Sequence, residues 1–420
     1  MSQQNQAPLH LPDLTTQAAL ELNEKYVSPQ RVAAYRAYGL DLVQGRREGV
    51  RIWDLDGNSF INCRSSGGVF NFGHRPAFAI EALKQALDEI DMGDWLLLSQ
   101  HRARAAQALA EVTPGDLQFT FFTASGAEAA EVAVKLARGV TKRPRIVCLE
   151  NGYHGHVGFG LAMDDAIYNQ WYHPLVPGVK RIPMNDIDAV DRAVDDQTAI
   201  VCMETIPATA GYIVPSKDYY EKVRRICDDR GALLMLDEVQ CGGGRTGKIW
   251  AAEHWNVTPD LLMFGKSTSG GIYPISGCCY NQRVEDFLKE DPIFHPSSYS
   301  GAEPGAVLVQ AVVNKLREPG FLEHVTEMSA RFKAGFDRLC AEYPDKLKEH
   351  RGLGLMLALE THSEAQSFEL MRGAVKNGIL AIFANNRRTS LLIMPPLIIS
   401  AQEVDEVLDG LEKATQTITA

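Results

Sequence analysis

Four short apolar segments in the middle of the 420-residue chain alternate with helical patterns, and this alternation constrains the fold most strongly. Segments 145–150, 199–204, 232–238 and 260–265 read RIVCLE, AIVCME, ALLMLDE and DLLMFG. Several are apolar throughout, which is typical of strands covered by helices on both faces of a sheet. Helical patterns cover 78–90 and 127–138. The alternation predicts an α/β fold with a mainly parallel sheet.

The pattern changes in the last third of the chain. A helical stretch over 305–316 leads to Pro319-Gly320, and helical patterns follow over 321–343 and 402–415. Near the start, two apolar-rich runs flank Asp56-Gly57, which is a strong hairpin signal. The expected units are an N-terminal segment (1–60) that belongs to a small domain, a large domain (61–318) and a C-terminal small domain (319–420).

Composition and charge argue against several classes of protein. The formal net charge of −11 argues against a nucleic-acid partner, whose binding surface would need a basic excess. The polar start of the chain lacks the basic end and apolar core of a secretory signal, and no apolar stretch is long enough for a membrane-spanning helix. The eight cysteines include no C-x-x-C pair, so neither a metal site nor a disulfide framework is predicted. We expect a cytoplasmic protein without a membrane partner.

Residues that could take part in catalysis or ligand binding come at or just after the ends of the predicted strands. Ligands of open α/β sheets bind outside the carboxyl ends of the strands. The residues at these ends are Glu150, Glu204, Asp237 and Lys266. Each residue alone is more often a cap or a solvated turn, so the prediction of a site depends on several strand ends meeting at one crevice.

A possible anion site lies in the segment TASGAEAAEVAVKLAR. Ser125-Gly126 leads directly into a helical pattern, and free amides at a helix N-terminus bind anions. Gly126 would allow a phosphate to approach the backbone closely. The alternative interpretation is an ordinary Ser/Gly helix cap.

The segment GGGRTG at 242–247 matches the dinucleotide-binding pattern G-x-G-x-x-G. That pattern requires a strand ending at the first glycine and a helix opening within it. Here DEVQC separates the predicted strand from the first glycine, and the following residues have no helical stripe. The match therefore does not predict a nicotinamide cofactor.

Five segments in the same order resemble the class III, or ω-type, aminotransferases. They are FFTASGAEAAEVAVKLAR, GYHG, LDEVQCGGGRTG, PDLLMFGKSTSGGIYP and RGLGLM, and the resemblance runs from about Gly49 to Leu411. It implies a pyridoxal 5'-phosphate enzyme of fold type I, with a seven-stranded sheet between helices in the large domain and a smaller α+β domain.

The resemblance implies a role for each matching residue. Lys266 matches the lysine that forms a Schiff base with the cofactor and later moves a proton, and Asp237 matches the partner of the pyridine nitrogen. Gln240 matches the residue that faces the phenolic oxygen. Tyr153 matches the aromatic residue that stacks on the ring, and His154 follows it.

Further matches concern the phosphate and the neighbouring subunit. Ser125, Gly126 and Ala127 match the segment whose backbone amides hold the phosphate. Glu204 matches a glutamate near the cofactor. Ser298 stands where the family has a threonine that reaches the phosphate of the neighbouring subunit, so the resemblance implies at least a homodimer with shared active sites.

The departures from the family concern the substrate. Glutamate-using members carry an arginine where this chain has Leu392, and a glutamate that neutralises this arginine where it has Thr209. Relatives acting on 4-aminobutyrate have an arginine at the position of His156. Arg387 and Arg388 lie close before Leu392 and could bind the substrate carboxylate in place of the missing arginine. Paired arginines in a polar loop are, however, more often solvated.

Three functions are compatible with these residues. The first is transamination from an amine or amino acid to a keto acid or aldehyde. The second is a racemase, epimerase or amino-alcohol-phosphate lyase on the same cofactor, which would not accumulate pyridoxamine phosphate. The third is a non-catalytic binding protein, against which the intact Lys266, Asp237 and Tyr153 argue.

Overall fold

The computed structural model describes residues 13–419, and its largest element is a seven-stranded sheet of order β4-β10-β9-β8-β7-β5-β6. The strands are β4 (Phe119–Thr123), β5 (Arg145–Leu149), β6 (Val179–Ile182), β7 (Thr198–Glu204), β8 (Leu233–Asp237), β9 (Leu261–Phe264) and β10 (Ser276–Tyr280). Strands β5 to β9 pair in parallel, whereas β10 runs antiparallel to both β9 and β4. The predicted α/β fold with a mainly parallel sheet is confirmed.

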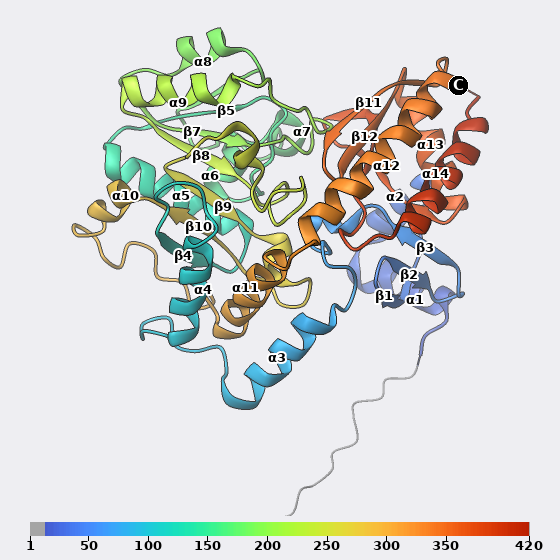
Figure 1. The fold of residues 1–420 in the computed structure, drawn as a ribbon, viewed down its shortest axis with the longest axis horizontal. Helices are drawn as coiled ribbons and strands as arrows, with labels where there is room; N and C mark the ends of the chain where they lie inside the picture. Colours follow the sequence, from blue (N-terminus) through green and yellow to red (C-terminus); the bar gives the residue numbers. More distant parts are fainter. Residues whose placement is uncertain (1–12, 420) are drawn as a thin grey trace, which may run out of the picture.

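Helices cover both faces of this sheet (Figure 1). Successive side chains of a strand point to opposite faces, so Ile200 and Cys202 of β7 pack with α5 (Gly126–Thr141), while Val201 and Met203 pack with the helices of the other face. These are α8 (Ile187–Ala193) and α9 (Tyr219–Arg230). Burial on both faces explains why the strands are apolar throughout rather than alternating.

The remaining elements of this part lie around the sheet. Helices α4 (Gln100–Ala110) and α11 (Glu303–Leu316) pack at the β4–β10 end, and α3 (Ala77–Glu89) lies against α11. Short elements complete it: η2 (Ser65–Gly68), α6 (Gly158–Met163), α7 (Ala166–Asn169), η3 (Ala251–Trp255), η4 (Lys266–Ser269) and α10 (Gln282–Phe287).

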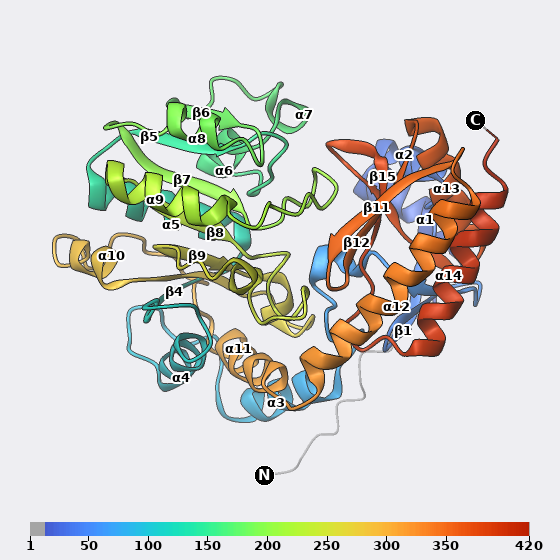
Figure 2. The same cartoon turned by 45° about the horizontal axis from the view of Figure 1, so that its top comes forward.

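The C-terminal part forms a second body beside the first (Figure 2). Helix α12 (Phe321–Glu342) leads into an antiparallel sheet of order β11-β12-β15-β14. Its strands are β11 (Leu347–Leu353), β12 (Met356–Thr361), β14 (Ile382–Ala384) and β15 (Arg387–Ile393), and the other helices of this body are α13 (Glu364–Lys376) and α14 (Ala401–Gln416).

The N-terminal chain joins this second body. Strands β1 (Gln44–Glu48), β2 (Arg51–Asp54) and β3 (Ser59–Asn62) form an antiparallel meander, and β13 (Ile379–Leu380) adds to β3 in parallel. The hairpin predicted at Asp56-Gly57 connects β2 and β3. Before it lie α1 (Thr16–Leu22), the π-helix η1 (Asn23–Val27) and α2 (Pro29–Tyr38). No helix within residues 13–419 is both long and apolar enough to cross a bilayer.

Arg245 connects the two bodies in the interior. Its guanidinium is fully buried and donates to the carbonyl oxygens of Leu355 (2.9 Å) and Pro395 (2.5 Å) and to Oδ1 of Asn71 (2.5 Å). Burial lowers the pKa of Arg245 to about 9, because no carboxylate compensates its charge. The acceptors come from separate parts of the chain, so this side chain joins the large-sheet body to the C-terminal body.

Candidate active site

The ends of three adjacent parallel strands meet at one cavity of about 250 Å³. Glu204 ends β7, Asp237 ends β8 in register with it, and Lys266 comes two residues after β9. All three line the cavity, as expected for an open α/β sheet. Glu150, which follows β5, is exposed and is not among the lining residues.

Asp237 is paired with a buried histidine. Nδ1 of His154 lies 2.8 Å from Oδ2 of Asp237, and the His154 side chain is fully buried. Burial acts to lower the pKa of His154, but the hydrogen bond and the charge of Asp237 outweigh it and raise that pKa to about 8. The other oxygen of Asp237 accepts a hydrogen bond from the Val239 amide at 3.0 Å. The orientation of the carboxylate is therefore set from two sides.

Lys266 has a strained backbone and a free amine. Its φ is +46°, in the left-handed region that side chains rarely adopt, and such strain is typical of functional positions. Within residues 13–419 its Nζ makes no hydrogen bond or ion pair. Burial lowers the pKa of Lys266, opposed by the charges of Asp237 and Glu204. A lowered pKa increases the fraction of neutral, nucleophilic amine.

Glu204 supports the backbone around the cavity. Its carboxylate accepts hydrogen bonds from the amides of Tyr153 (3.0 Å) and Ala208 (2.9 Å). Burial raises the pKa of Glu204 to about 7, partly opposed by the nearby His154. Through these bonds Glu204 fixes the turn that places the Tyr153 ring at the wall of the cavity.

The N-terminus of α5 forms another wall. Gly126 and Ala127 line the cavity, and Ser125 caps the helix by accepting from the Glu128 amide at 3.2 Å. Ser125 itself is exposed and lies outside the lining. The free amides and the helix dipole favour an anion at this position.

A second cavity of about 300 Å³ shares lining residues with the first and opens toward the C-terminal body. Tyr153, Gln240 and Lys266 belong to both. Residues from distant segments also line it, among them Arg64, Tyr168, Tyr212, Ile382, Phe383 and Asn385. We call this space the outer cavity.

The two positions that depart from the family pattern lie on this outer cavity. Leu392 and Thr209 both line it. Oγ1 of Thr209 donates to the carbonyl oxygen of Asn151 (2.7 Å) and accepts from Nδ2 of Asn386 (3.1 Å), and the Asn386 amide donates to the Thr209 carbonyl oxygen at 3.0 Å. The β14–β15 turn is thus attached directly to the large-sheet body beside the cavity.

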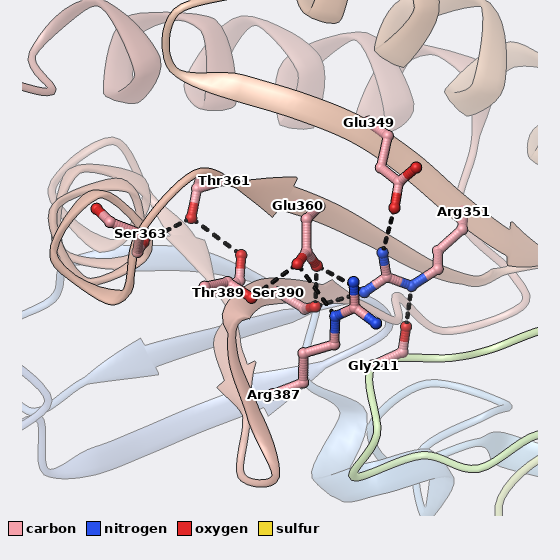
Figure 3. Close-up of polar contacts among 9 residues, drawn as sticks. All are labelled: Gly211, Glu349, Arg351, Glu360, Thr361, Ser363, Arg387, Thr389 and Ser390. Carbon is pink, nitrogen blue, oxygen red and sulfur yellow. Dashed lines mark hydrogen bonds and ion pairs between the residues drawn. The ribbon is translucent and has the colours of Figure 1, made fainter. Parts of the chain in front are cut away.

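The paired arginines lie elsewhere, and Figure 3 shows Arg387 beside Glu360. Nε of Arg387 donates to Oε1 of the buried Glu360 at 3.0 Å, and Arg351 donates to Oε2 of the same carboxylate at 2.7 Å. The guanidinium of Arg388 lies 5.9 Å from the Phe383 ring centroid. Neither Arg387 nor Arg388 lines the outer cavity.

Comparisons with known proteins agree with this geometry. The family model of class III aminotransferases matches residues 34–415. An aminotransferase of Archaeoglobus fulgidus, itself uncharacterized, is 43% identical over 397 residues, which cover 94% of this chain and 93% of the relative. The chain belongs to the class III aminotransferase family.

Solved structures show the same fold. A taurine:2-oxoglutarate aminotransferase of Bifidobacterium kashiwanohense, in complex with pyridoxal phosphate and glutamate, superposes with a TM-score of 0.88 at 26% identity, covering 97% of this chain and 100% of that one. An ornithine aminotransferase of Toxoplasma gondii gives a TM-score of 0.86 at 25% identity, with 97% and 99% covered. The predicted fold type I and pyridoxal-phosphate-dependent transamination are confirmed.

The first cavity of this aminotransferase fits its cofactor. It offers a free amine at Lys266, a carboxylate at Asp237 held by a buried histidine, and a glycine-opened helix N-terminus at Gly126. These groups match an aldehyde, a pyridine nitrogen and a phosphate. The donor set therefore suits pyridoxal phosphate.

Most residues predicted for the site line this cavity: Gly126, Ala127, Tyr153, His154, Glu204, Asp237, Gln240 and Lys266. Ser298 is exposed and lies outside both cavities. Four lining residues of the outer cavity were not predicted from the sequence: Arg64, Tyr168, Tyr212 and Asn385. Arg64 follows β3 as Lys266 follows β9, so extending the search for polar residues after strands to the N-terminal hairpin would have found it.

Proposed function

We propose that this aminotransferase transfers an amino group from an amine or amino acid to a keto acid or aldehyde, with Lys266 as its catalytic base. The observation that carries the proposal is the meeting of Lys266, the His154–Asp237 pair and the α5 N-terminus at one cavity. Bound pyridoxal phosphate supplies an electrophilic carbon and an electron-accepting ring.

Each wall of the cavity then has a role. Lys266 would hold the cofactor through Nζ, and its free amine would move a proton at that atom. Asp237 would keep the pyridine nitrogen protonated, since a carboxylate favours the charged form of its partner. The Gly126 and Ala127 amides would hold the phosphate, Gln240 would bind the phenolic oxygen, and the Tyr153 ring would exclude water.

His154 and Glu204 act through these residues. His154 orients Asp237 and, when protonated, compensates its charge. The raised pKa of His154 favours the protonated form at neutral pH. Glu204 positions Tyr153 through its amide. Both are therefore proposed as positioning residues.

We further infer a cytoplasmic homodimer with shared active sites. A cavity of about 630 Å³ is lined by Trp95, Leu96, Leu97 and Leu98 together with segment 292–301. The Leu98 side chain is fully exposed in the single chain, and such apolar patches are typical of protein interfaces. Ser298 lies in the same segment, as its proposed contact with the phosphate of the neighbouring subunit requires.

The test is a single half-reaction. Purified holoenzyme without keto acid is mixed with glutamate, alanine, 4-aminobutyrate, diamines or β-amino acids, while the absorbance of the cofactor is followed. A donor should convert the cofactor stoichiometrically to its aminated form, and a keto acid should reverse the change. Lys266→Ala should show neither. Product with inverted stereochemistry or released phosphate, without any aminated cofactor, would contradict the proposal.

A further inference from the structure

The charged side chains that line the outer cavity are basic, whereas Glu204 and Asp237 lie in the adjoining first cavity. The lining of the outer cavity includes Arg64, Lys266 and His156, and it includes no aspartate or glutamate. His156 faces the buried Asp164, with Nδ1 3.6 Å from Oδ2, so a protonated His156 would already have a carboxylate partner. A cavity of this kind stabilises an anion and disfavours a second ammonium group.

Arg64 is held at this cavity by its backbone. Its amide donates to Oδ1 of Asn62 at 3.1 Å, and the buried Asn62 side chain contacts Nε2 of His74 at 2.9 Å. Three residues later, a Cβ atom placed on Gly67 would lie 3.3 Å from Cε of Lys266. The loop that carries Arg64 therefore runs directly beside the reactive lysine.

The guanidinium of Arg64 is available to bind a ligand. Within residues 13–419 it makes no hydrogen bond or ion pair, whereas Arg387 and Arg351 are bound to Glu360. It lines the outer cavity together with Tyr212. Burial and the charge of Glu204 raise the pKa of Tyr212, and the charges of Arg245 and Arg64 oppose this rise. The Tyr212 hydroxyl accepts from Nε2 of Gln240 at 3.4 Å.

We infer that Arg64 binds the carboxylate of the amino donor and selects carboxylated substrates over plain amines. A guanidinium can bind a carboxylate through parallel hydrogen bonds. Arg64 follows the N-terminal hairpin. It would thus provide the positive charge that glutamate-using members have at the position of Leu392 in β15. The inference rests on the proposed transamination and adds the substrate class and the residue that selects it.

The test compares matched donors in the half-reaction of the holoenzyme. Alanine, β-alanine and 4-aminobutyrate are paired with 2-aminopropane, 1-aminopropane and 1-aminobutane, in which a methyl group replaces the carboxylate. Arg64→Gln should raise the half-saturating concentration of the best carboxylated donor about 10- to 100-fold, as expected for loss of charge-assisted hydrogen bonds. It should leave the matched amine within about twofold. In Arg64→Lys the half-saturating concentration of the carboxylated donor should lie between the wild-type value and that of Arg64→Gln. The control Arg388→Gln should behave as wild type.

The outcomes separate the two proposals. If no donor aminates the cofactor in the wild type, the proposed function fails. If wild type reacts but does not favour carboxylated donors, or if Arg64→Gln weakens both members of a pair equally, Arg64 does not select the carboxylate. Absorbance titration with pyridoxal phosphate gives an independent readout. Unchanged cofactor affinity in Arg64→Gln supports the inference, and a loss would assign Arg64 to the cofactor instead.

Discussion

The carboxylate of Glu360 is the centre of a buried network in the C-terminal body (Figure 3). It accepts hydrogen bonds from Arg351 (2.7 Å), Arg387 (3.0 Å), Thr389 (2.7 Å) and Ser390. Arg351 also donates to the Gly211 carbonyl oxygen at 2.6 Å, in the loop beside the outer cavity. We predict that Glu360→Gln destabilises this sheet and loosens its contact with the loop.

The expected magnitude follows from the pKa of Glu360. Burial acts to raise that pKa, but the hydrogen bonds of Ser390, Arg351 and Thr389 outweigh it and lower the pKa to about 2, from an ordinary 4.5. Since one pH unit corresponds to about 1.4 kcal/mol, the charged form contributes roughly 3 kcal/mol near neutral pH. A lowered carboxyl pKa gives stability that is present in full above about pH 4.5 and is lost as pH falls toward 2.

The measurement is urea unfolding followed by circular dichroism, with hydrogen exchange of β12 and β15 as a local readout. Glu360→Gln should lower the free energy of unfolding by roughly 3 kcal/mol at pH 7 and by less at pH 4. The control is Glu349→Gln, because Glu349 contacts the same Arg351 at 3.1 Å but is exposed. It should change stability by less than about 0.5 kcal/mol. The reasoning would be refuted if both variants lost the same free energy of unfolding. It would also be refuted if Glu360→Gln lost more at pH 4 than at pH 7.

Other predictions concern the cofactor and the interface. Lys266→Ala should release pyridoxal phosphate on gel filtration and lose the half-reaction, whereas retention of an absorbing covalent cofactor would reject Lys266 as its attachment point. Because the pKa of His154 is raised to about 8 from 6.5, its contribution to stability is present in full below pH 6.5 and is lost as pH rises through 8. Urea unfolding of the cofactor-free protein should show this loss, and His154→Gln should abolish it; an unchanged pH profile in the variant contradicts the assignment. Leu98→Glu should convert the proposed homodimer to monomers in sedimentation experiments, because it would place a charge in the proposed interface, and an unchanged sedimentation coefficient excludes this patch.

The parallel sheet and the main groups of the cofactor site follow from local features of the sequence. Segments such as 199–203 and 232–236 are apolar on both faces, which is typical of a sheet covered by helices on both sides. Asp237 and Lys266 come at or just after strand ends, and parallel strands bring those ends to one edge. The division into 1–60, 61–318 and 319–420 stays a prediction, as do the roles of the individual site residues.

Only the tertiary structure decided which polar groups are paired and which are free. Arg387 and Arg64 are both arginines near predicted strands. Yet Arg387 binds Glu360, whereas the Arg64 side chain lines the outer cavity and has no hydrogen-bond or ion-pair partner among residues 13–419. Likewise, the Thr209–Asn386 contact joins residues that are 177 positions apart. Residue type and spacing describe what a side chain can bind, whereas its actual partner depends on which distant segments the folded core brings within hydrogen-bonding distance.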